Sequence, residues 1–312
     1  MIDLTIIVVS WNVRDLLRCC LRSIRDSALT GDLQFEIVVV DNASSDGSPE
    51  MIAAEFPDVR LVANAENRGF TAANNQGLAL SQGRFLLLLN PDTEVVGDAL
   101  PTMVRYMEAH PEVGAVGPQL RYPDGSLQSS RRRFPTFATA LVESTVIQEW
   151  WTDNRFLRRY YMADTPDHVI QPVDWIVGAC LMVRREVYER VGGLDERFFM
   201  YSEELDWCRR IKSAGWTVVY LPDAVVVHHE GKSSEQVVAA RHIYFHSSKV
   251  RYFSKHHGRF QGEILRRFLL TTYVYQLARE GVKWLVGHKR PLRMERIKAY
   301  SQVLRSGLRG SP

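Results

Sequence analysis

Six acidic or imidazole side chains stand where the sequence predicts that strands end or helices begin. A single carboxylate at a helix start is usually a cap for backbone N–H groups. As a set, however, carboxylates and an imidazole on one edge can hold a hard divalent cation, with water or substrate oxygens completing its shell. Such a cation commonly bridges phosphates, so the set indicates a phosphate-containing ligand. The six residues are Asp41, Asp92, Glu203, Glu204, Asp206 and His228.

The sequence contains none of the common glycine-rich phosphate loops. It has no G-x-x-x-x-G-K-[ST] loop, and no G-x-G-x-x-G follows its first predicted strand. These absences argue against P-loop ATPases and dinucleotide oxidoreductases. The sequence also argues against a serine hydrolase, because it contains no Ser-His-Asp order with a G-x-S-x-G motif. A nucleotidyltransferase would need a glycine-rich, lysine-bearing loop where Ser10-Trp-Asn-Val-Arg-Asp stands. A metal held by carboxylates is therefore the expected partner of a diphosphate.

Strands that alternate with helices bring these side chains to one edge. Apolar runs at 4–9, 35–40, 59–63 and 85–89 predict buried strands, and the segments between them predict helices. This alternation is typical of a right-handed, doubly wound, mostly parallel α/β sheet. Three of the strands end in polar groups: Asn12, then Asp41 and Asn42, then Asn90 and Asp92. Because ligands bind at the carboxyl edge of such sheets, we expect a site there.

Further elements are predicted beyond residue 95. We expect a helix over 98–110, strands over 113–117 and 173–183, and a helix that begins near Ser202 and runs to about Ala214. Gly178, inside the strand over 173–183, allows close approach of another chain segment. Two more strands, 217–221 and 224–227, lead to His228 and His229.

Composition and charge divide the chain in two. The 312 residues are 46% hydrophobic and 24% charged, as in ordinary globular proteins, with a net charge of +3. Residues 241–312 hold 16 Lys and Arg against 3 Asp and Glu, a net +13, while the first 240 hold 23 against 33, a net −10. The four cysteines show no zinc or C-x-x-C spacing, and neither a signal peptide nor an 18-residue apolar run is found. We therefore expect a cytoplasmic protein with free thiols.

The basic segment 241–312 has apolar and aromatic residues at helical spacing. Basic, aromatic-rich amphipathic helices are typical of peripheral membrane binding, here on the inner face of the cytoplasmic membrane. The alternative is a helical bundle that packs its aromatics on the catalytic domain or on a second subunit of a homo-oligomer. Nucleic-acid binding is not expected, because no recognisable module is present.

Several motifs together resemble the inverting nucleotide-sugar glycosyltransferases of family 2, which have the GT-A fold. The resemblance covers roughly residues 1–235, and is closest to bacterial rhamnosyltransferases that use dTDP-L-rhamnose. It implies a GT-A domain at 1–235, with a nucleotide-binding half (1–120) and an acceptor-binding half (121–235), and a helical extension at 236–312. The motifs are Ile-Val-Val-Ser-Trp-Asn at 7–12, Val-Val-Val-Asp-Asn-Ala-Ser-Ser-Asp-Gly-Ser at 38–48, Asn-Arg-Gly-Phe-Thr-Ala-Ala-Asn-Asn at 67–75, Leu-Asn-Pro-Asp at 89–92, Phe-Met-Tyr-Ser-Glu-Glu-Leu-Asp at 199–206 and His-His-Glu-Gly-Lys-Ser at 228–233.

The resemblance also implies roles for individual residues. Asp41 would accept a hydrogen bond from N3–H of a pyrimidine base. Asp92 stands where the family's Asp-x-Asp motif ends, and with His228 it would hold Mg²⁺ or Mn²⁺; His229 is a rival ligand. Glu204 would be the catalytic base, with Asp206 as the alternate. The other residues expected to bind the nucleotide sugar are Ser10, Asn12, Asn67, Arg68, Gly69, Asn74, Asn90, Trp175, Gly178 and Ala179.

The implied reaction moves a sugar, which we expect to be L-rhamnose from dTDP-L-rhamnose, from a nucleotide diphosphate to a hydroxyl group. The acceptor would be a glycan or a polyprenyl-diphosphate-linked lipid in cell-wall or surface-polysaccharide biosynthesis. The alternatives are another UDP- or dTDP-sugar as donor, or a protein that binds nucleotide sugars at a membrane surface without catalysis. Retention of Asp41, Asp92, Glu204 and His228 together argues against the non-catalytic alternative.

Overall fold

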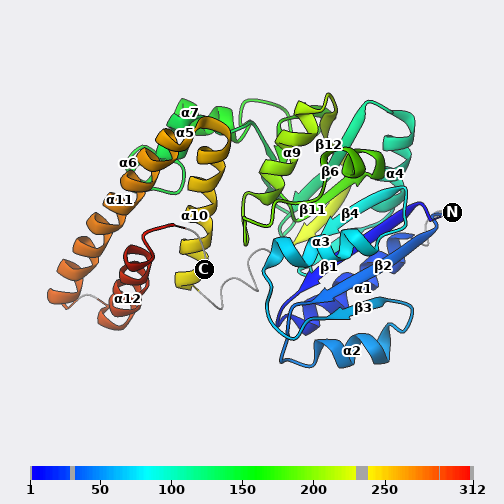
Figure 1. Ribbon diagram of the computed structural model, residues 1–312, viewed down its shortest axis with the longest axis horizontal. Coiled ribbons are helices and arrows are strands. Elements are labelled where there is room, and N and C mark those ends of the chain that lie inside the picture. The colour runs from blue at the N-terminus through cyan, green and yellow to red at the C-terminus, as the bar shows by residue number, and fades with distance from the viewer. Residues whose placement is uncertain (1, 29–31, 230–237, 288, 310–312) are drawn as a thin grey trace. The chain divides into compact units, whose positions relative to one another are not determined.

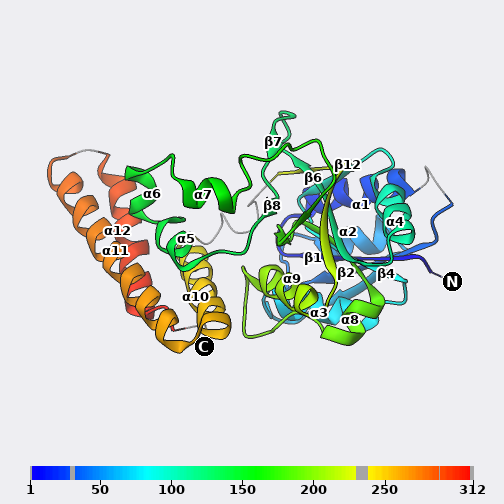
Figure 2. The ribbon, with the colours of Figure 1, turned by 90° about the horizontal axis from the view of Figure 1, so that it is seen from above.

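The computed structural model describes residues 2–28, 32–229, 238–287 and 289–309. The chain forms two compact units: unit 1 holds residues 1–134, 161–197 and 203–233, and unit 2 holds 135–160, 198–202 and 234–312 (Figures 1 and 2). The boundary that we predict at residue 235 lies outside the described residues and stays a prediction. Residues 230–233 of the last family motif also lie outside them.

Unit 1 contains a sheet that is ten-stranded in the part of the chain described. Its main path runs β3-β2-β1-β4-β11-β6-β12-β5, while β7 pairs with β6 and β9 with β12. Strands β3, β2, β1 and β4 are parallel neighbours, and β6 and β12 are also parallel. The predicted doubly wound, mostly parallel α/β architecture is thus confirmed. The strands are β1 (Leu4–Ser10), β2 (Phe35–Asp41), β3 (Arg60–Ala63), β4 (Phe85–Leu89), β5 (Thr93–Val96), β6 (Val113–Arg121), β7 (Leu127–Gln128), β8 (Arg131–Arg132), β9 (Gln171–Val173), β10 (Trp175–Ile176), β11 (Cys180–Arg184) and β12 (Thr217–His228).

Helices cover both faces of this sheet, which explains why β1 and β4 are apolar without alternation. Every residue of β1 and β4 is buried. On one face, Leu17 and Leu21 of α1 join the main core. On the other, α3 lies so close that a Cβ on Gly77 would be 2.3 Å from Ile7 Cγ2, which accounts for the small residues of that helix. The helices of unit 1 are α1 (Arg14–Ala28), α2 (Ser48–Glu55), α3 (Phe70–Leu80), α4 (Ala99–Ala109), α8 (Arg185–Val191) and α9 (Glu203–Ser213).

Three details of the strand predictions are wrong. The single strand expected over 173–183 is instead β9, β10 and β11, with the chain turning through Gly178 between β10 and β11. The two strands expected over 217–227 form one strand, β12, with an irregular register between Leu221 and Val225. Strand β5 was not expected. It pairs antiparallel with β12, which brings Thr93 opposite His228. Because β5 is short, it leaves little periodicity in the sequence.

Unit 2 is helical, as predicted for the C-terminal segment, but it also includes residues 135–160. Helices α10, α11 and α12 pack on one another, and α5 packs on α11. Lys249 of α10 pairs with Glu143 just after α5, and Phe137 meets Phe253 edge to face, with ring centroids 6.2 Å apart. No helix in the described ranges is both long and apolar enough to cross a bilayer. The helices of unit 2 are α5 (Phe137–Val142), α6 (Val146–Trp150), α7 (Arg155–Tyr160), α10 (Val238–His257), α11 (Arg259–Leu285) and α12 (Arg290–Ser306).

Candidate functional site

The carboxyl ends of β1, β2 and β4 meet at one edge, as the sequence predicts. Ser10 lies opposite Asp41 in the parallel register of β1 and β2, and Val8 lies opposite Leu89 at the end of β4. The loops that follow these strands are therefore neighbours. This edge holds buried polar atoms that have no hydrogen-bond partner within the described residues, and buried polar atoms are normally paired. They are Ser10 Oγ, Asp41 Oδ1 and Asn90 Oδ1.

The loops after β1 and β2 hold each other through side-chain contacts. Asn12 accepts a hydrogen bond from the Ser45 N–H (2.8 Å) on its Oδ1, and its own N–H donates to Ser44 Oγ (2.9 Å). Ser44 N–H in turn donates to Asp41 Oδ2 (2.9 Å). One oxygen of Asp41 thus fixes the loop, while the other, Oδ1, is left for a ligand. The positive φ of Asn12 (54°) lets the chain turn sharply at the end of β1.

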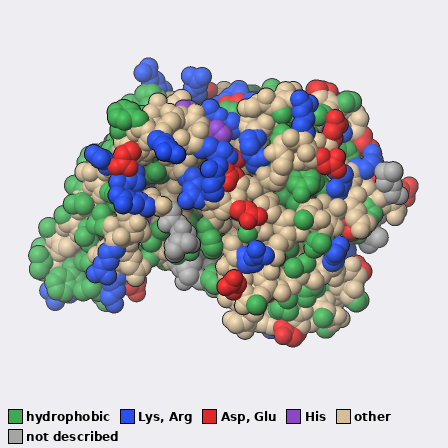
Figure 3. Space-filling view, viewed as in Figure 1, with side chains coloured by type: hydrophobic (Ala, Val, Ile, Leu, Met, Phe, Trp, Pro, Cys, Tyr) green, Lys and Arg blue, Asp and Glu red, His purple; other side chains and the backbone are tan. Residues whose placement is uncertain are grey.

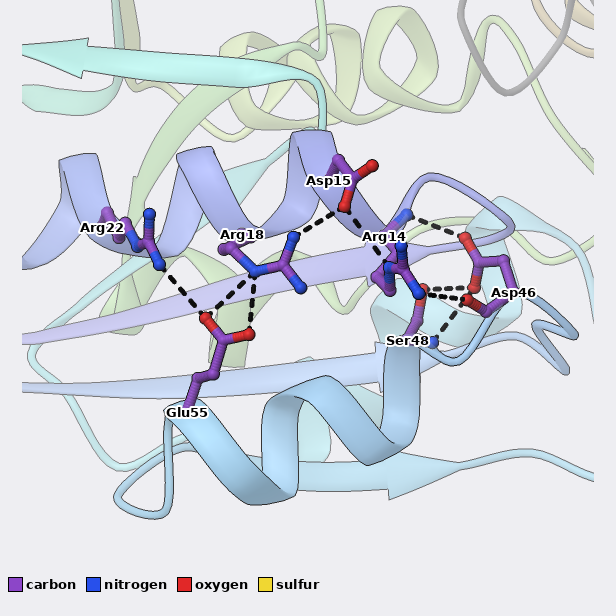
Figure 4. A network of polar contacts seen from close by, with 7 residues as sticks. All are labelled: Arg14, Asp15, Arg18, Arg22, Asp46, Ser48 and Glu55. Carbon is purple, nitrogen blue, oxygen red and sulfur yellow. Dashed lines mark hydrogen bonds and ion pairs between the residues drawn. The ribbon is translucent and has the colours of Figure 1, made fainter.

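Asp46 joins the same two loops to two helices (Figure 4). Its carboxylate accepts from the Arg14 N–H (2.8 Å), at the start of α1, and from the Ser48 N–H (3.1 Å) and hydroxyl (2.6 Å), at the start of α2. One side chain therefore caps two helices. Burial alone would raise the pKa of Asp46, but these hydrogen bonds outweigh it and hold the pKa below its ordinary value. Sequence reasoning did not assign Asp46 to the site.

A cluster of hydrogen-bonded amides, formed by Asn42 and Asn67, lies between the end of β2 and the start of α3. Asn42 donates to Asn67 Oδ1 (2.9 Å) and accepts from the Arg68 N–H (3.0 Å). Asn67 Oδ1 also accepts from the Gly69 N–H (3.0 Å). The predicted binding residues Asn67, Arg68 and Gly69 are thus held by Asn42, which the sequence places at this edge but without indicating this contact. Their backbone is positioned at the site edge, whereas the Asn67 amide is used within the loop.

Asn74 and Trp175 make contacts that give them structural roles. The Asn74 amide donates to the Phe70 carbonyl (2.9 Å) within α3. The Trp175 indole N–H donates to the Arg133 carbonyl (3.0 Å), and its ring is buried. Their predicted contacts with a nucleotide sugar stay predictions.

The metal-ligand candidates come together from strand ends 136 residues apart in the sequence. His228 Nε2 lies 3.4 Å from Asp92 Oδ1 and 3.4 Å from Asn90 Nδ2. Asp92 and His228 are 5% and 6% exposed, so both groups are largely shielded from water. Within the described part of the chain, no three His, Cys, Asp or Glu side chains form a metal-binding group. The site therefore offers a reduced ligand set of one carboxylate, one imidazole and one amide.

Gln128, in β7, determines which nitrogen of His228 faces Asp92. Gln128 Oε1 lies 2.9 Å from His228 Nδ1, and an amide oxygen can only accept a hydrogen bond. Nδ1 of a neutral His228 therefore carries the proton, and Nε2 presents its lone pair to Asp92 and Asn90. A carbonyl or carboxylate behind a metal-ligating histidine commonly orients it in this way. Nothing in the sequence pattern around residues 127–128 pointed to this role.

His229 points to another partner. Its Nε2 lies 2.7 Å from Glu94 Oε1, while its backbone N–H donates to the Asp92 carbonyl (2.9 Å). Successive side chains of an extended chain alternate between faces. The alternation therefore favours His228 over His229 beside Asp92.

Glu204, in the first turn of α9, lies against the turn that joins β10 and β11. Gly178 N–H lies 3.4 Å from Glu204 Oε1, and a Cβ on Gly178 would be 3.3 Å from Glu204 Cγ. The neighbouring Ala179 carbonyl accepts from the Asn90 N–H (2.9 Å), which links this turn to the end of β4. Burial raises the pKa of Glu204, and burial together with Glu204 raises that of Glu203. A carboxylate with a raised pKa and a buried, unpartnered Oε2 is suited to accept a proton.

Asp206 is committed to a different task. It is fully buried and accepts a hydrogen bond from Arg210 Nε (2.9 Å), while Nη1 and Nη2 of Arg210 donate to the carbonyls of Val191 and Gly193. This arrangement fastens α9 to the end of α8. The geometry therefore favours Glu204 over Asp206 as a base.

Comparison with known proteins adds three findings. Residues 5–192, more than half of the chain, match the family model described as Glycosyl transferase family 2. An N-acetylglucosaminyl-diphospho-decaprenol L-rhamnosyltransferase of Mycobacterium tuberculosis is 30% identical over 76% of this chain and 80% of its own length. Rhamnosyltransferase WbbL of Escherichia coli is 24% identical over 80% of this chain and 92% of its own length.

Solved structures confirm the predicted GT-A fold. A mannosyltransferase from Pyrobaculum calidifontis, in complex with GDP-Man and Mn²⁺, has a TM-score of 0.56 at 20% identity and covers 98% of this chain and 84% of its own. GalNAc-T7 with UDP, GalNAc and Mn²⁺ has the same TM-score at 14% identity and covers 81% of this chain and 48% of its own.

Proposed function

This chain belongs to glycosyltransferase family 2, and on that premise we propose that it transfers L-rhamnose from dTDP-L-rhamnose to a polyprenyl-diphosphate-linked glycan. The observation that carries the proposal is the set of buried, unpartnered oxygens at one edge of unit 1, on Ser10, Asp41 and Asn90. Such atoms are costly unless a ligand completes their hydrogen bonds. The choice of rhamnose is supported by the relatives of Mycobacterium tuberculosis and Escherichia coli, which are both rhamnosyltransferases, and the choice of acceptor by the first of them.

Asp41 is suited to a thymine or uracil base. Its Oδ2 is held by Ser44, which leaves Oδ1 as a fixed acceptor for the N3–H donor of such a base. The cluster of amides formed by Asn42 and Asn67 holds the backbone of Arg68 and Gly69 at the same edge. These residues bind and orient the nucleotide and exclude water from it.

The residues at the end of β4 fit Mg²⁺ or Mn²⁺. A carboxylate oxygen of Asp92, the Nε2 lone pair of His228 and the unpartnered amide oxygen of Asn90 are donor types that such cations accept. When bound, the cation supplies positive charge that stabilises a departing diphosphate. Both solved structures compared above contain Mn²⁺, which supports a divalent metal but does not choose between Mg²⁺ and Mn²⁺.

Glu204 is proposed as the catalytic base. Its carboxylate takes the proton of the acceptor hydroxyl while that oxygen forms a bond to the anomeric carbon from the face opposite the diphosphate. The bond from the anomeric carbon to the diphosphate breaks with its electron pair, so the sugar is transferred with inversion. General-base assistance of this kind is worth about 10²–10⁴-fold in rate.

A lipid-linked acceptor would confine the reaction to the cytoplasmic face of a membrane, on which we propose that the enzyme is a peripheral protein. Its homo-oligomeric state stays a prediction.

Donor binding tests the proposal directly. The melting temperature should rise with dTDP-L-rhamnose and Mn²⁺ more than with GDP-mannose or UDP-glucose, and rhamnosylated GlcNAc-diphosphate-polyprenol should form. In Asp41→Asn, an amide donor replaces the acceptor for N3–H, so the stabilisation by dTDP-L-rhamnose should be lost. The matched control is Asp58→Asn, which makes the same change at an exposed carboxylate. Its melting temperature should rise with dTDP-L-rhamnose as that of the wild type does. If all donors raise the melting temperature of the wild type equally, the choice of dTDP-L-rhamnose is wrong. If dTDP-L-rhamnose stabilises Asp41→Asn as much as it stabilises the wild type, the role of Asp41 is wrong.

A further inference from the structure

Helix α11 presents an apolar face to solvent. Seven of its ten exposed residues are apolar, whereas the outward face of a helix in a soluble protein is normally polar. From Val274 to Leu285, the exposed apolar positions Val274, Ala278, Val282 and Leu285 recur at intervals of three or four residues, so they form one stripe along the helix, with Tyr275 adjacent to it. Leu285 is 68% exposed. The apolar stripe consists of Val274, Tyr275, Ala278, Val282 and Leu285.

The opposite face of α11 is occupied by its own unit. Leu265, Leu269 and Tyr273 are buried, and α11 packs against α10, α12 and α5. The stripe is therefore not the packing face of the helix within unit 2. An exposed contiguous apolar patch on a monomer marks an interaction surface.

Trp150, at the end of α6, extends the apolar stripe beyond α11. The indole of Trp150 is 67% exposed and meets the Tyr275 ring edge to face, with centroids 5.6 Å apart. The ion pair of Arg279 with Glu149 (2.6 Å) fixes α6 beside α11. Tryptophan and tyrosine favour the interface between lipid and water. Figure 3 shows hydrophobic side chains along the edge formed by α11, bordered by Lys and Arg.

Charge decides what covers the apolar stripe. Residues 241–312 carry a net +13, and Arg267 lies on the exposed face of α11 itself. Lys283 and Arg290 flank the end of the helix, with the Arg290 guanidinium 5.5 Å from the Trp284 ring centroid. A second copy of the chain would place this charge against itself across a two-fold interface. An anionic lipid surface complements it.

We propose that the apolar stripe of α11, with Trp150, lies in the interface of an anionic membrane, parallel to its surface. An in-plane helix needs an apolar face with basic flanks, and no described helix could span the bilayer instead. The proposal rests on the peripheral location proposed above and deepens it by naming the surface that binds, but it does not depend on the donor or acceptor chosen there.

Flotation with vesicles tests it on the full-length protein. Wild type should float with phosphatidylglycerol vesicles and much less with phosphatidylcholine vesicles, because the basic residues need an anionic partner. The double variant Val282→Glu/Leu285→Glu should lose about tenfold or more of its affinity for phosphatidylglycerol vesicles, since two carboxylates would enter the interface. Both positions are exposed, so the fold should be kept, with an unchanged melting temperature as the check.

The matched control is Val169→Glu/Ile170→Glu, which adds the same charges at exposed apolar positions of unit 1 and should float as wild type. If Val282→Glu/Leu285→Glu floats as wild type, the stripe is not the docking surface. If sedimentation shows a wild-type dimer that this variant breaks while flotation is unchanged, a second copy covers the stripe, and the membrane proposal is wrong. Sugar transfer to a soluble acceptor analogue should persist in the variant, which separates this test from that of the proposed function.

Discussion

At the scale of single residues, the site depends on which atoms are already paired. Asp41, Asp206 and Glu204 look alike in sequence as carboxylates near element ends. In the structure, Asp206 is held by Arg210, one oxygen of Asp41 is held by Ser44, and one oxygen of Glu204 is unpartnered within the described residues. This difference separates a structural carboxylate from two that are available to ligands. Sequence could indicate the set but not this division, because the partners come from distant segments.

Gln128 should control metal affinity through the orientation of His228. Gln128→Leu removes the acceptor for Nδ1–H, so Mn²⁺ affinity should fall about 10–100-fold, the usual cost of losing such a partner. Gln128→Glu keeps an acceptor oxygen and should stay much closer to wild type. Titration calorimetry with Mn²⁺ measures both. Equal affinities in all three proteins would show that Gln128 does not orient the histidine.

Glu203 should destabilise the fold as the pH rises. Its pKa is raised by burial and by Glu204. Between the pKa of the unfolded chain and that of the folded protein, the native state therefore still holds a proton that the unfolded chain has released. Stability is therefore fully present below the unfolded pKa and falls as pH rises toward the folded one. Glu203→Gln should raise the melting temperature at pH 8 by a few degrees, on the order of 2–4 °C per kcal/mol, and change it little at pH 4. A higher melting temperature only at pH 4 would reverse the assignment.

At the scale of elements, the loops after β1 and β2 are fixed by the helices that follow them. Sequence predicted these strands and helices because their apolar runs and turn residues are local signals. It did not predict that Asp46 caps both α1 and α2 (Figure 4), because the contact to Arg14 crosses 32 residues. The split of the expected strand over 173–183 was missed for a similar reason. The turn at Gly178 is explained by the approach of Glu204 from α9.

Removal of the Asp46 cap should weaken both stability and donor binding. Asp46→Ala leaves N–H groups of two helix starts without their acceptor, which costs about 1–2 kcal/mol for each strong cap. The loop that carries Asp41 should also lose order, so dTDP affinity should fall. Asp15→Ala, at an exposed carboxylate of the same network, should change stability little, because exposed ion pairs are screened by water. Urea unfolding and dTDP titration compare them, and equal effects of the two substitutions would refute the capping role.

At the scale of the whole molecule, unit 2 is discontinuous in sequence. The basic C-terminal helices were predicted from composition and periodicity, but the addition of residues 135–160 and 198–202 was not. Those segments are short, the helices within 135–160 have only five or six residues each, and their partners are distant in sequence. Lys249, largely buried, donates to the Glu143 carbonyl (2.8 Å) and pairs with its carboxylate.

This buried pair should hold α5 on α10. Lys249→Met leaves the Glu143 carboxylate buried without its partner, which is expected to cost about 3–5 kcal/mol. Limited proteolysis should then cut within residues 135–160 faster than in wild type. The control Lys283→Met removes a half-exposed lysine of α11 and should leave the cutting rate unchanged. Identical proteolysis of all three proteins would contradict the role of the pair.

The central claim is that Glu204 is the base of a sugar transfer at this edge, and its most direct test is the turnover of Glu204→Gln. With dTDP-L-rhamnose, Mn²⁺ and the lipid-linked acceptor all saturating, kcat should fall about 10²–10⁴-fold, because the amide cannot take the proton. Donor and Mn²⁺ affinities should stay as in wild type, since neither ligand is assigned to Glu204. A kcat equal to that of wild type under the same conditions would contradict the account.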